Sequence, residues 1–501
     1  MATKISKKVR DTISKARSFD FWAWLDEGAK LSELPLLGTP DYMFKLGYWT
    51  GGMTAAAFFW QVISGLLLLM YYEPGSAYSS TEYIINNVAF GKILLASHLY
   101  GAYAMIFLAF VHLFRNYFVG AYKKPRELQW VIGILTGATV FGTAFFGYSL
   151  VGDTLSVDGA DVAKGLLQGA PFGSTLLNIF FGPGGETAQF TRVLAWHITL
   201  AALVALLFML HLGLAEQNGI MPSPRLFNYK APAEMDKKAA PKWWPKNFLY
   251  TAAILFWVWG FILIIPSILL MLPQNSIPIL LSPLPGPPPT SAAAANIPPY
   301  PLWFFLNVYK IVDFQLPIFQ GGSGSFIAVT IGGLLPLLYL LLLPFLDRSD
   351  KLHPLDRIIH TIIIIWLLVV WLVTYAAWGA LTPGLPIPSI RVAEVTLIPT
   401  IIIFIGMAIV YLTWRGPSPH VAAKELSSRE ITVKRAYASL ILVFLVAFEV
   451  AIMAVLWKLL PYDSFEPIIG VLVGVGLVVF GEVISLYRYI AYPPLPGAKS
   501  E

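Results

Sequence analysis

Ten long runs of apolar residues, separated by polar connections, dominate the pattern along the chain. Each run is long enough for a transmembrane helix, which needs about 20 apolar residues. The expected spans are 52–72, 91–114, 131–151, 194–214, 248–271, 326–346, 358–378, 396–414, 437–457 and 467–487. The pattern therefore predicts an all-α integral membrane protein with about ten transmembrane helices.

The polar connections divide this series of spans. We expect a cytoplasmic surface segment over 1–50, with an amphipathic stretch near 10–30 lying on the inner membrane surface. A four-helix domain then covers 51–230, a second helical domain covers 231–416, and two additional helices fill 417–501. The connections 152–193 and 272–303 are long, and we expect short surface helices in the first; the second is rich in proline.

Composition excludes a soluble globule. Hydrophobic residues make up 57% of the 501 residues and charged residues 12%, whereas soluble domains carry roughly 25% charged residues. The absence of cysteine excludes disulfides, thiolate zinc sites, cysteine-held iron–sulfur clusters and covalently attached c-type haem. A bound metal would therefore need histidine or carboxylate ligands.

The net charge of +6 follows membrane topology, so we expect no nucleic-acid partner. If both termini are cytoplasmic, most of the 34 Lys and Arg residues lie inside, which satisfies the positive-inside rule. The N-terminus has no early apolar stretch, so we expect no cleavable signal peptide. The six basic residues expected outside are Lys92, Lys164, Arg192, Lys310, Arg391 and Lys458.

Two pairs of histidines lie inside the predicted spans. His98 and His112 are on the second span, and His197 and His211 are on the fourth. A separation of 14 residues is four turns less about 40°, with a rise of about 21 Å, so both histidines of a pair share one helix face. The two spans run in the same direction, which places one facing imidazole pair in each leaflet.

Paired imidazoles on facing helices suit a six-coordinate haem iron in a helix bundle. The simpler alternative, hydrogen bonding within the bundle, does not require equal spacing and matched depth. A third alternative is a proton-coupled transporter with a histidine relay, but the sequence shows neither inverted repeats nor broken helices. We interpret the other histidines, His353, His360 and His420, as surface residues.

Glycine and arginine residues support two planar cofactors. Gly51 and Gly65 on the first span, and Gly133 and Gly147 on the third, repeat the interval of 14. A missing side chain allows a porphyrin edge to approach the backbone, although small residues also serve helix packing. Two arginines near the histidines, Arg115 and Arg192, are candidates to neutralise haem propionates.

These features resemble cytochrome b of the cytochrome bc and b6f complexes. The matching stretches are GGMTAAAFFWQVISG, SHLYGAYAMIFLAFVHLFR, WVIGILTGATVFGTAFFGYSL and FTRVLAWHITLAALVALLFMLHL, within a resemblance that covers roughly 45–415. It implies two non-covalent haems, an outer one held by His98 and His197 and an inner one held by His112 and His211. We expect haem b, and a-type haem stays open. The two extra spans resemble extended archaeal forms.

The resemblance also implies an outer quinol site near a Pro-Glu-Trp-Tyr motif. The corresponding residues here are Pro301, Leu302, Trp303 and Phe304, so leucine replaces the glutamate that accepts a proton in the family. Tyr148 matches a family tyrosine of the quinol pocket. Without the glutamate, the proton would leave through Tyr148, Tyr300, Asp153, Asp313 or water, or outer quinol oxidation is altered or lost. An aromatic interfacial belt is the alternative interpretation of this stretch.

The inner quinone site has little support in the sequence. Glu216 stands where the family has a second histidine, and the family's Lys-Asp pair has no clear counterpart. Glu449 and Glu482 lie in the two extra spans and are either proton relays or hydrogen-bonding groups between helices; we interpret them as structural.

The function implied by the resemblance is that of a di-haem subunit in a quinol-oxidising membrane complex coupled to proton translocation. Its expected partners are a Rieske iron–sulfur protein, quinone, the lipid bilayer and a second copy of the chain. Loop 272–301 is a candidate docking surface for the iron–sulfur protein. The alternative is the di-haem subunit of a terminal quinol oxidase supercomplex, with oxidase subunits as partners.

Overall fold

The computed structural model describes residues 20–34, 36, 38–235, 242–314, 316–319, 321–376, 387–417, 424–425, 427–462, 465–494 and 499–500. Residues 1–19, 35 and 37 of the predicted surface segment and His420 therefore lie outside the described residues. Among the described residues, ten helical spans are long and apolar enough to cross a membrane, which confirms the all-α membrane fold. They are Thr50–Leu69, Gly91–Val119, Glu127–Ser149, Glu186–Asn218, Lys246–Met271, Gly321–Leu346, Pro354–Val373, Ser389–Thr413, Ser428–Leu459 and Glu466–Ala491.

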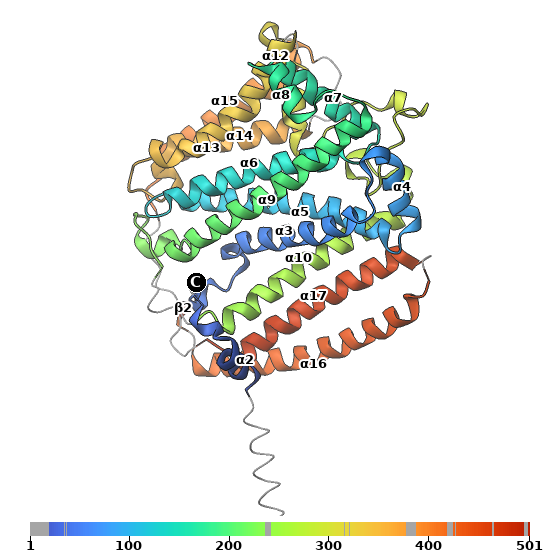
Figure 1. Ribbon diagram of the computed structural model, residues 1–501. Coiled ribbons are helices and arrows are strands. Elements are labelled where there is room, and N and C mark those ends of the chain that lie inside the picture. Colours follow the sequence, from blue (N-terminus) through green and yellow to red (C-terminus); the bar gives the residue numbers. More distant parts are fainter. Residues whose placement is uncertain are drawn as a thin grey trace, which may run out of the picture.

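The spans form a stack of tilted helices (Figure 1). Four of them make the central bundle: α3 (Thr50–Leu69) packs on α5 (Gly91–Val119), and α6 (Glu127–Ser149) packs on α9 (Glu186–Asn218). We call the two ends of this bundle the His98 end and the His112 end. Helix α5 ends at the His112 end because Gly120 takes the left-handed conformation (φ 74°) that caps a helix.

On one side of the bundle lie α12 (Gly321–Val329), the π-helical segment η11 (Thr330–Leu334), α13 (Leu335–Leu346), α14 (Ile358–Ala376) and α15 (Ser389–Thr413). On the other side lie α10 (Lys246–Met271), α17 (Glu466–Ala491) and α16 (Ser428–Leu459), in that order (Figure 1). The division into domains at residues 230 and 416 stays a prediction.

The contact between α10 and α17 depends on glycine. A Cβ atom built on Gly474 would lie 2.7 Å from the Gly260 carbonyl oxygen, and one built on Gly260 would lie 2.5 Å from the Gly474 oxygen. Small residues let membrane helices approach this closely. Glu449 of α16 fits beside Gly476 of α17 with its Oε2 atom buried, so it lies in the contact between the two extra helices.

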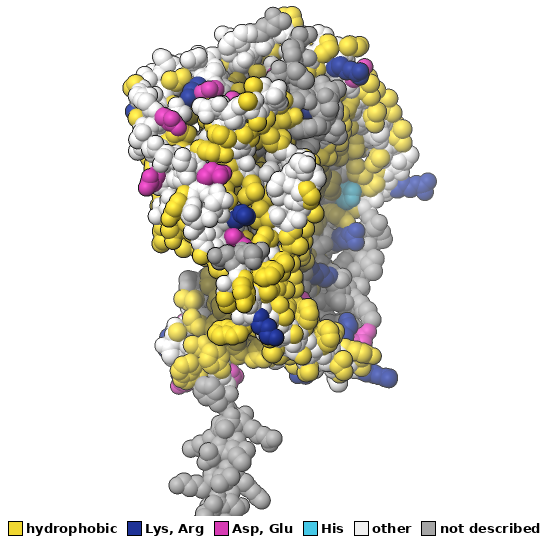
Figure 2. Space-filling view, turned by 90° about the vertical axis from the view of Figure 1, so that its right-hand side faces the viewer, with side chains coloured by type: hydrophobic (Ala, Val, Ile, Leu, Met, Phe, Trp, Pro, Cys, Tyr) yellow, Lys and Arg dark blue, Asp and Glu magenta, His cyan; other side chains and the backbone are white. Residues whose placement is uncertain are grey.

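Short elements cover the bundle ends. The connection 152–193 folds into two surface helices, as expected, whereas the proline-rich loop 272–303 contains only short 3₁₀ turns. At the His98 end, seen face on in Figure 2, charged side chains are scattered singly among hydrophobic and uncharged ones. The short elements are α2 (Phe21–Ala29), α4 (Ala77–Asn87), α7 (Thr154–Gln168), α8 (Gly173–Phe180), α11 (Leu306–Val312), β1 (Lys424–Glu425) and β2 (Lys499–Ser500).

A buried polar cluster joins the bundle to α13 and α14 at the His112 end. Lys123 Nζ lies 2.8 Å from Asp347 Oδ1, and both side chains are about 5% exposed or less. Tyr122 donates a hydrogen bond to Asp347 Oδ2 over 2.5 Å, and Arg357 bonds to the Phe118 carbonyl. We call Tyr122, Lys123, Asp347 and Arg357 the ion clamp.

Two histidines near this cluster are less exposed than the sequence interpretation assumed. His360 Nδ1 lies 3.1 Å from the Tyr339 hydroxyl, and the ring of His353 stacks on Trp414 with centroids 4.7 Å apart. Both are only partly exposed, because Tyr339 packs against His360 and Trp414 against His353.

Candidate functional site

The four intramembrane histidines face each other in the central bundle. The rings of His112 (α5) and His211 (α9) have centroids 6.3 Å apart and planes at 83°. His98 lies close enough to His197 for the two rings to interact electrostatically. The structure thus brings together the two pairs that the sequence predicts, one at each end of the bundle.

Each imidazole is oriented through its Nδ1 atom. Ser64 Oγ lies 2.8 Å from His98 Nδ1, and Thr50 Oγ1 lies 3.0 Å from His112 Nδ1. On α9 the partners are backbone carbonyls of α6: Thr143 for His197 and Gln129 for His211, each at 2.9 Å. Metal-bound histidines are typically held in this way, with one nitrogen hydrogen-bonded and the other left for the metal.

The four predicted glycines each make room for one of these rings. A Cβ atom on Gly147 would lie 2.6 Å from His197 Cε1, and a Cβ on Gly133 or Gly51 would lie 2.9 Å from the ring of His211 or His112. The corresponding distance from Gly65 to His98 is 3.2 Å. The close approach that we ascribed to a porphyrin edge is therefore made, in this structure, by the imidazoles themselves.

The donor set fits a haem iron. A metal–imidazole bond is about 2 Å long, and the ring separation of His112 and His211 leaves room for one metal ion between them. Among the described residues no group of three or more His, Asp or Glu side chains forms a metal site. Two protein ligands suit a metal whose remaining ligands come from a macrocycle. Asn116 Nδ2, 3.0 Å from His112 Nε2, would have to turn away.

The two arginines predicted near the propionates are hydrogen-bonded to the protein. Arg115 donates to Asn116 Oδ1 (2.8 Å) and to the Met221 carbonyl (3.0 Å). Arg192 Nη1 donates to the Phe181 carbonyl over 2.8 Å. Both remain near the bundle ends, so their role toward propionates stays a prediction.

The predicted quinol residues lie together at the His98 end. The Tyr148 hydroxyl, at the end of α6, donates to the Tyr300 carbonyl over 3.1 Å. Phe304 is buried and its ring meets Phe141 of α6 at 5.4 Å between centroids, while Trp303 lies 5.3 Å from Phe304. Pro301 is buried beside them. The stretch therefore packs into the bundle rather than forming a surface aromatic belt.

Leu302, which stands in the place of the family glutamate, is an apolar core residue. Leu302 is 5% exposed and belongs to the apolar core. Asp153, one of the alternative proton acceptors, uses both carboxylate oxygens: Oδ1 accepts from Ser156 N at 2.9 Å and Oδ2 from Gly286 N at 2.6 Å. It thereby ties the end of α6 to the proline-rich loop.

Lys310 is a candidate that the sequence analysis did not single out as functional. Its side chain is completely buried in α11, directly after the aromatic stretch. Burial lowers the pKa of Lys310 to about 8, against the opposing attraction of Asp313. A buried lysine that titrates near neutral pH can exchange a proton. Nothing in the sequence distinguishes it from an ordinary flanking lysine.

A charged pair at the His112 end was also missed. Lys246, at the start of α10, forms an ion pair with Asp41 of the segment before α3. Beside it the ring of Phe44 stacks on Trp49, which directly precedes α3. The sequence separation of about 200 residues hid this pair, since only the fold brings the start of α10 to the start of α3.

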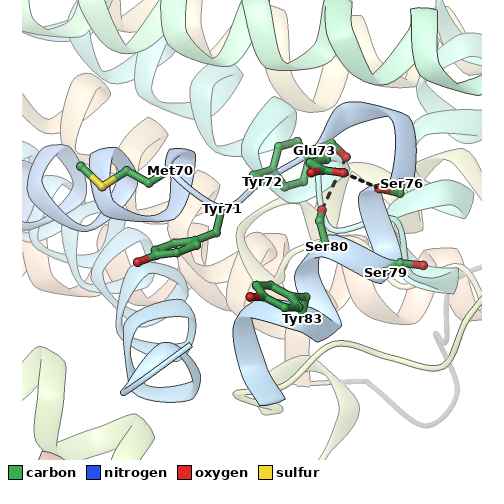
Figure 3. A pocket seen from close by; sticks show the side chains of 8 residues that line it. All are labelled: Met70, Tyr71, Tyr72, Glu73, Ser76, Ser79, Ser80 and Tyr83. Atoms are coloured by element: carbon green, nitrogen blue, oxygen red, sulfur yellow. Dashed lines mark hydrogen bonds between the residues drawn. The ribbon is translucent and has the colours of Figure 1, made fainter. Parts of the chain in front are cut away.

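A cavity of about 430 Å³ opens beyond Leu69, the C-terminal end of α3 (Figure 3). Ser76 and Ser80 both donate hydrogen bonds to Glu73 within it, at 3.3 and 3.5 Å. All of its lining residues come from positions 70–83, and none is a histidine or a predicted quinol residue. The cavity is therefore separate from the histidine pairs.

Comparison with known proteins agrees with this geometry. The family described as "Cytochrome b(N-terminal)/b6/petB" matches residues 103–285. The chain is 44% identical to cytochrome b of Sulfolobus acidocaldarius over 398 residues, covering 76% of this chain and 69% of that protein. It is 32% identical to a cytochrome bc complex cytochrome b subunit of Chlorobaculum thiosulfatiphilum, covering 68% and 76%.

A solved structure, "Hyperthermophilic respiratory Complex III", superimposes with a TM-score of 0.57 at 25% identity. The match covers 78% of this chain and 98% of that chain. Sequence, fold and histidine geometry thus lead to one assignment, and the chain belongs to the cytochrome b family.

Proposed function

We propose that this chain is the di-haem subunit of a quinol-oxidising respiratory complex. The observation that carries the proposal is the presence of two histidine pairs. Each imidazole ring is oriented by a hydrogen bond at Nδ1 and lies against a glycine. When bound, haem supplies reversible one-electron chemistry that no protein side chain here provides. Haem b is the form we propose.

The protein orients the ligands and insulates the path between the two sites. His98 and His112 are separated by about 21 Å of helix rise, and the space between them is filled by the apolar core of the bundle, which includes Ala57, Met105 and Val140. Such a core excludes water and ions from the region between the sites.

We propose that quinol binds at the His98 end, against Tyr148, Tyr300, Pro301, Trp303 and Phe304. A quinone site combines an apolar, aromatic wall with a few polar groups, and this stretch has both. Leu302 cannot accept the quinol proton, so Tyr148 and Lys310 are the groups we assign to proton transfer. Lys310 qualifies because burial holds its pKa near 8.

The partners we propose are a Rieske iron–sulfur protein and a second copy of the chain. Two of the proteins matched are named as part of a cytochrome bc complex or of Complex III, which favours this assembly over a terminal oxidase. Loop 272–301 is the proposed docking surface, since Asp153 fixes it beside the end of α6. Shortening the loop should slow reduction of the partner and leave haem binding intact; an unchanged rate would reject this role.

The test is a reduced-minus-oxidised spectrum of purified protein with haem quantified per chain. We expect two haems, and a pyridine haemochrome assay distinguishes haem b from a-type haem. His98→Ala or His197→Ala should remove one chromophore, and His112→Ala or His211→Ala the other. A colourless protein would contradict the assignment. So would a single-histidine variant that stays folded but loses both haems.

A further inference from the structure

Arg488, near the end of the extra helix α17, is buried against the central part of the molecule. Its residue is 8% exposed, and its guanidinium carbon lies 4.4 Å from the ring centroid of Phe44 and 5.0 Å from that of Tyr250. Among the described residues, the Nε atom of Arg488 has no hydrogen-bond partner. Stacking on aromatic rings stabilises an arginine, but it leaves this donor unused.

In the described part of the chain, no carboxylate forms an ion pair with Arg488. Asp41 is within electrostatic reach, yet its carboxylate is already paired with Lys246, whose Nζ lies 5.5 Å from the same Phe44 ring. Glu482 of α17 lies within electrostatic reach of the same Tyr250 ring, but it too forms no ion pair with Arg488. An unpaired buried charge is costly, so the arrangement favours a ligand that brings an oxygen acceptor or a negative charge.

The aromatic wall of this site leads directly to one histidine pair. Trp49 lies 5.0 Å from Tyr250 and 6.2 Å from Phe44, centroid to centroid. The next residue, Thr50, holds His112 through its Nδ1 atom at 3.0 Å. A flat ligand against these rings would therefore lie next to the His112 pair, where electrons could pass to or from it.

We propose that Arg488 binds the quinone that exchanges electrons at the His112 end, so that the extra helix α17 forms part of this site. The guanidinium donates to a quinone carbonyl oxygen, and Phe44, Trp49 and Tyr250 supply the aromatic wall. Glycine packing of α17 on α10 fixes the helix close enough for Arg488 to reach these rings. This inference rests on the proposed function, since it presupposes haem at His112 and His211.

The first experiment measures reoxidation of the pre-reduced haems by a short-chain quinone in the purified complex. Arg488→Gln should raise the half-saturating quinone concentration about tenfold, the usual worth of a hydrogen bond to a charged group, with little change in the maximal rate. Arg488→Lys should restore part of the affinity. The matched control, Arg435→Gln, removes an exposed cation of α16 near the same end and should behave as wild type.

Haem content separates the possible failures. If wild-type protein lacks two haems, the proposed function fails. If wild-type protein reduces quinone and Arg488→Gln has normal haem spectra and unchanged quinone affinity, only the inference about Arg488 fails. Bound phospholipid is counted in the same samples: loss of phosphorus in the variant with unchanged quinone affinity identifies a lipid-phosphate site and overturns the proposal.

A second experiment needs no variant and so does not depend on folding. An azidoquinone is photolysed with the wild-type complex, and the labelled peptides are mapped by mass spectrometry. We expect label in the last turns of α17, around 485–491, and in the segment 41–49, both displaced by excess quinone. Label confined to the His98 end would overturn the proposal.

Discussion

Single residues account for the precision of the histidine pairs. A hydroxyl or a backbone carbonyl holds each Nδ1 atom, and a glycine lies against each ring. A hydrogen bond at Nδ1 fixes the ring orientation and the tautomer. The missing Cβ allows the neighbouring helix to approach the ring. The hydrogen bond is needed because an imidazole free to rotate would bind a metal only part of the time. The glycine is needed because a side chain there would push the ring away.

The glycines should therefore differ in their sensitivity to substitution. A Cβ on Gly147 would come within 2.6 Å of His197 Cε1, whereas a Cβ on Gly65 stays 3.2 Å from His98. We expect Gly147→Ala to displace His197 and reduce haem occupancy at the His98 end by more than Gly65→Ala does. Haem per chain and the reduced-minus-oxidised spectrum measure this; equal occupancy in the two variants would contradict the steric argument.

Because of Lys310, the free energy of unfolding should depend on pH in the alkaline range. Burial lowers its pKa from 10.5 to about 8, so between these values the unfolded chain binds the extra proton and the folded chain does not. The free energy of unfolding therefore rises as pH increases from 8 to 10.5, by up to about 3 kcal/mol. Thermal unfolding in detergent measures it.

The control for this prediction is Lys310→Met, which keeps the volume and removes the titration. The variant should lose the rise in unfolding temperature between pH 8 and 10.5 and equal or exceed wild type at neutral pH. Parallel pH profiles for the two proteins would show that Lys310 titrates normally.

The sequence predicted which side chains the bundle brings together, but not what holds them. The interval of 14 residues placed four histidines and four glycines correctly relative to each other, since helix periodicity alone determines it. The Nδ1 partners Thr50 and Ser64 depend on the rotation of α3 against α5, which no spacing encodes. Lys246 and Asp41 were missed for the same reason.

At the scale of elements, the ion clamp joins the α5–α6 connection to α13 and α14. Burial would by itself raise the pKa of Asp347, but hydrogen bonds from Lys123, Tyr122 and Ser349 lower it below its usual value. The ionised form is thus the one that stabilises the fold. Its contribution is present above the unfolded pKa and is lost as pH falls through the lowered value.

Asp347→Asn should weaken this contact strongly. The change leaves Lys123 and Arg357 buried without their counter-charge, a situation that costs about 3–5 kcal/mol. We expect a lower unfolding temperature at neutral pH and a smaller difference from wild type in acid. Asp350→Asn is the matched control, because Asp350 is exposed nearby. Equal unfolding temperatures of the two variants would contradict a structural role for the clamp.

Element boundaries show where sequence patterns stop being informative. The apolar run of the fourth span predicts 194–214, yet α9 extends from Glu186 to Asn218. Likewise α16 begins at Ser428, where Ser427 and Glu430 form a capping box, before the predicted start at 437. Hydropathy detects the part of a helix that lies in lipid, whereas capping and packing decide where the helix begins and ends.

For the whole molecule, the extra helices change which surface of the bundle meets lipid. In the order α3, α10, α17, α16 (Figure 1), α17 lies between α10 and α16, and of the two extra helices α16 is the more exposed. The sequence indicated two added spans but not their position, because a span's neighbours follow from side-chain fit, here the glycines of α10 and α17. That position is what brings Arg488 to the start of α3.

The orientation in the membrane can be tested directly, because the chain contains no cysteine. Ser174 on α8 and Ser428 on α16 are exposed and lie on opposite sides in the predicted topology. The positive-inside rule predicts that a membrane-impermeant maleimide added to intact cells labels Ser174→Cys and not Ser428→Cys. In inverted vesicles the pattern should reverse, with detergent-solubilised membranes as the control that both sites react. Labelling of Ser428→Cys from outside would contradict the predicted topology and would place the proposed quinol residues Tyr148 and Trp303 at the cytoplasmic face.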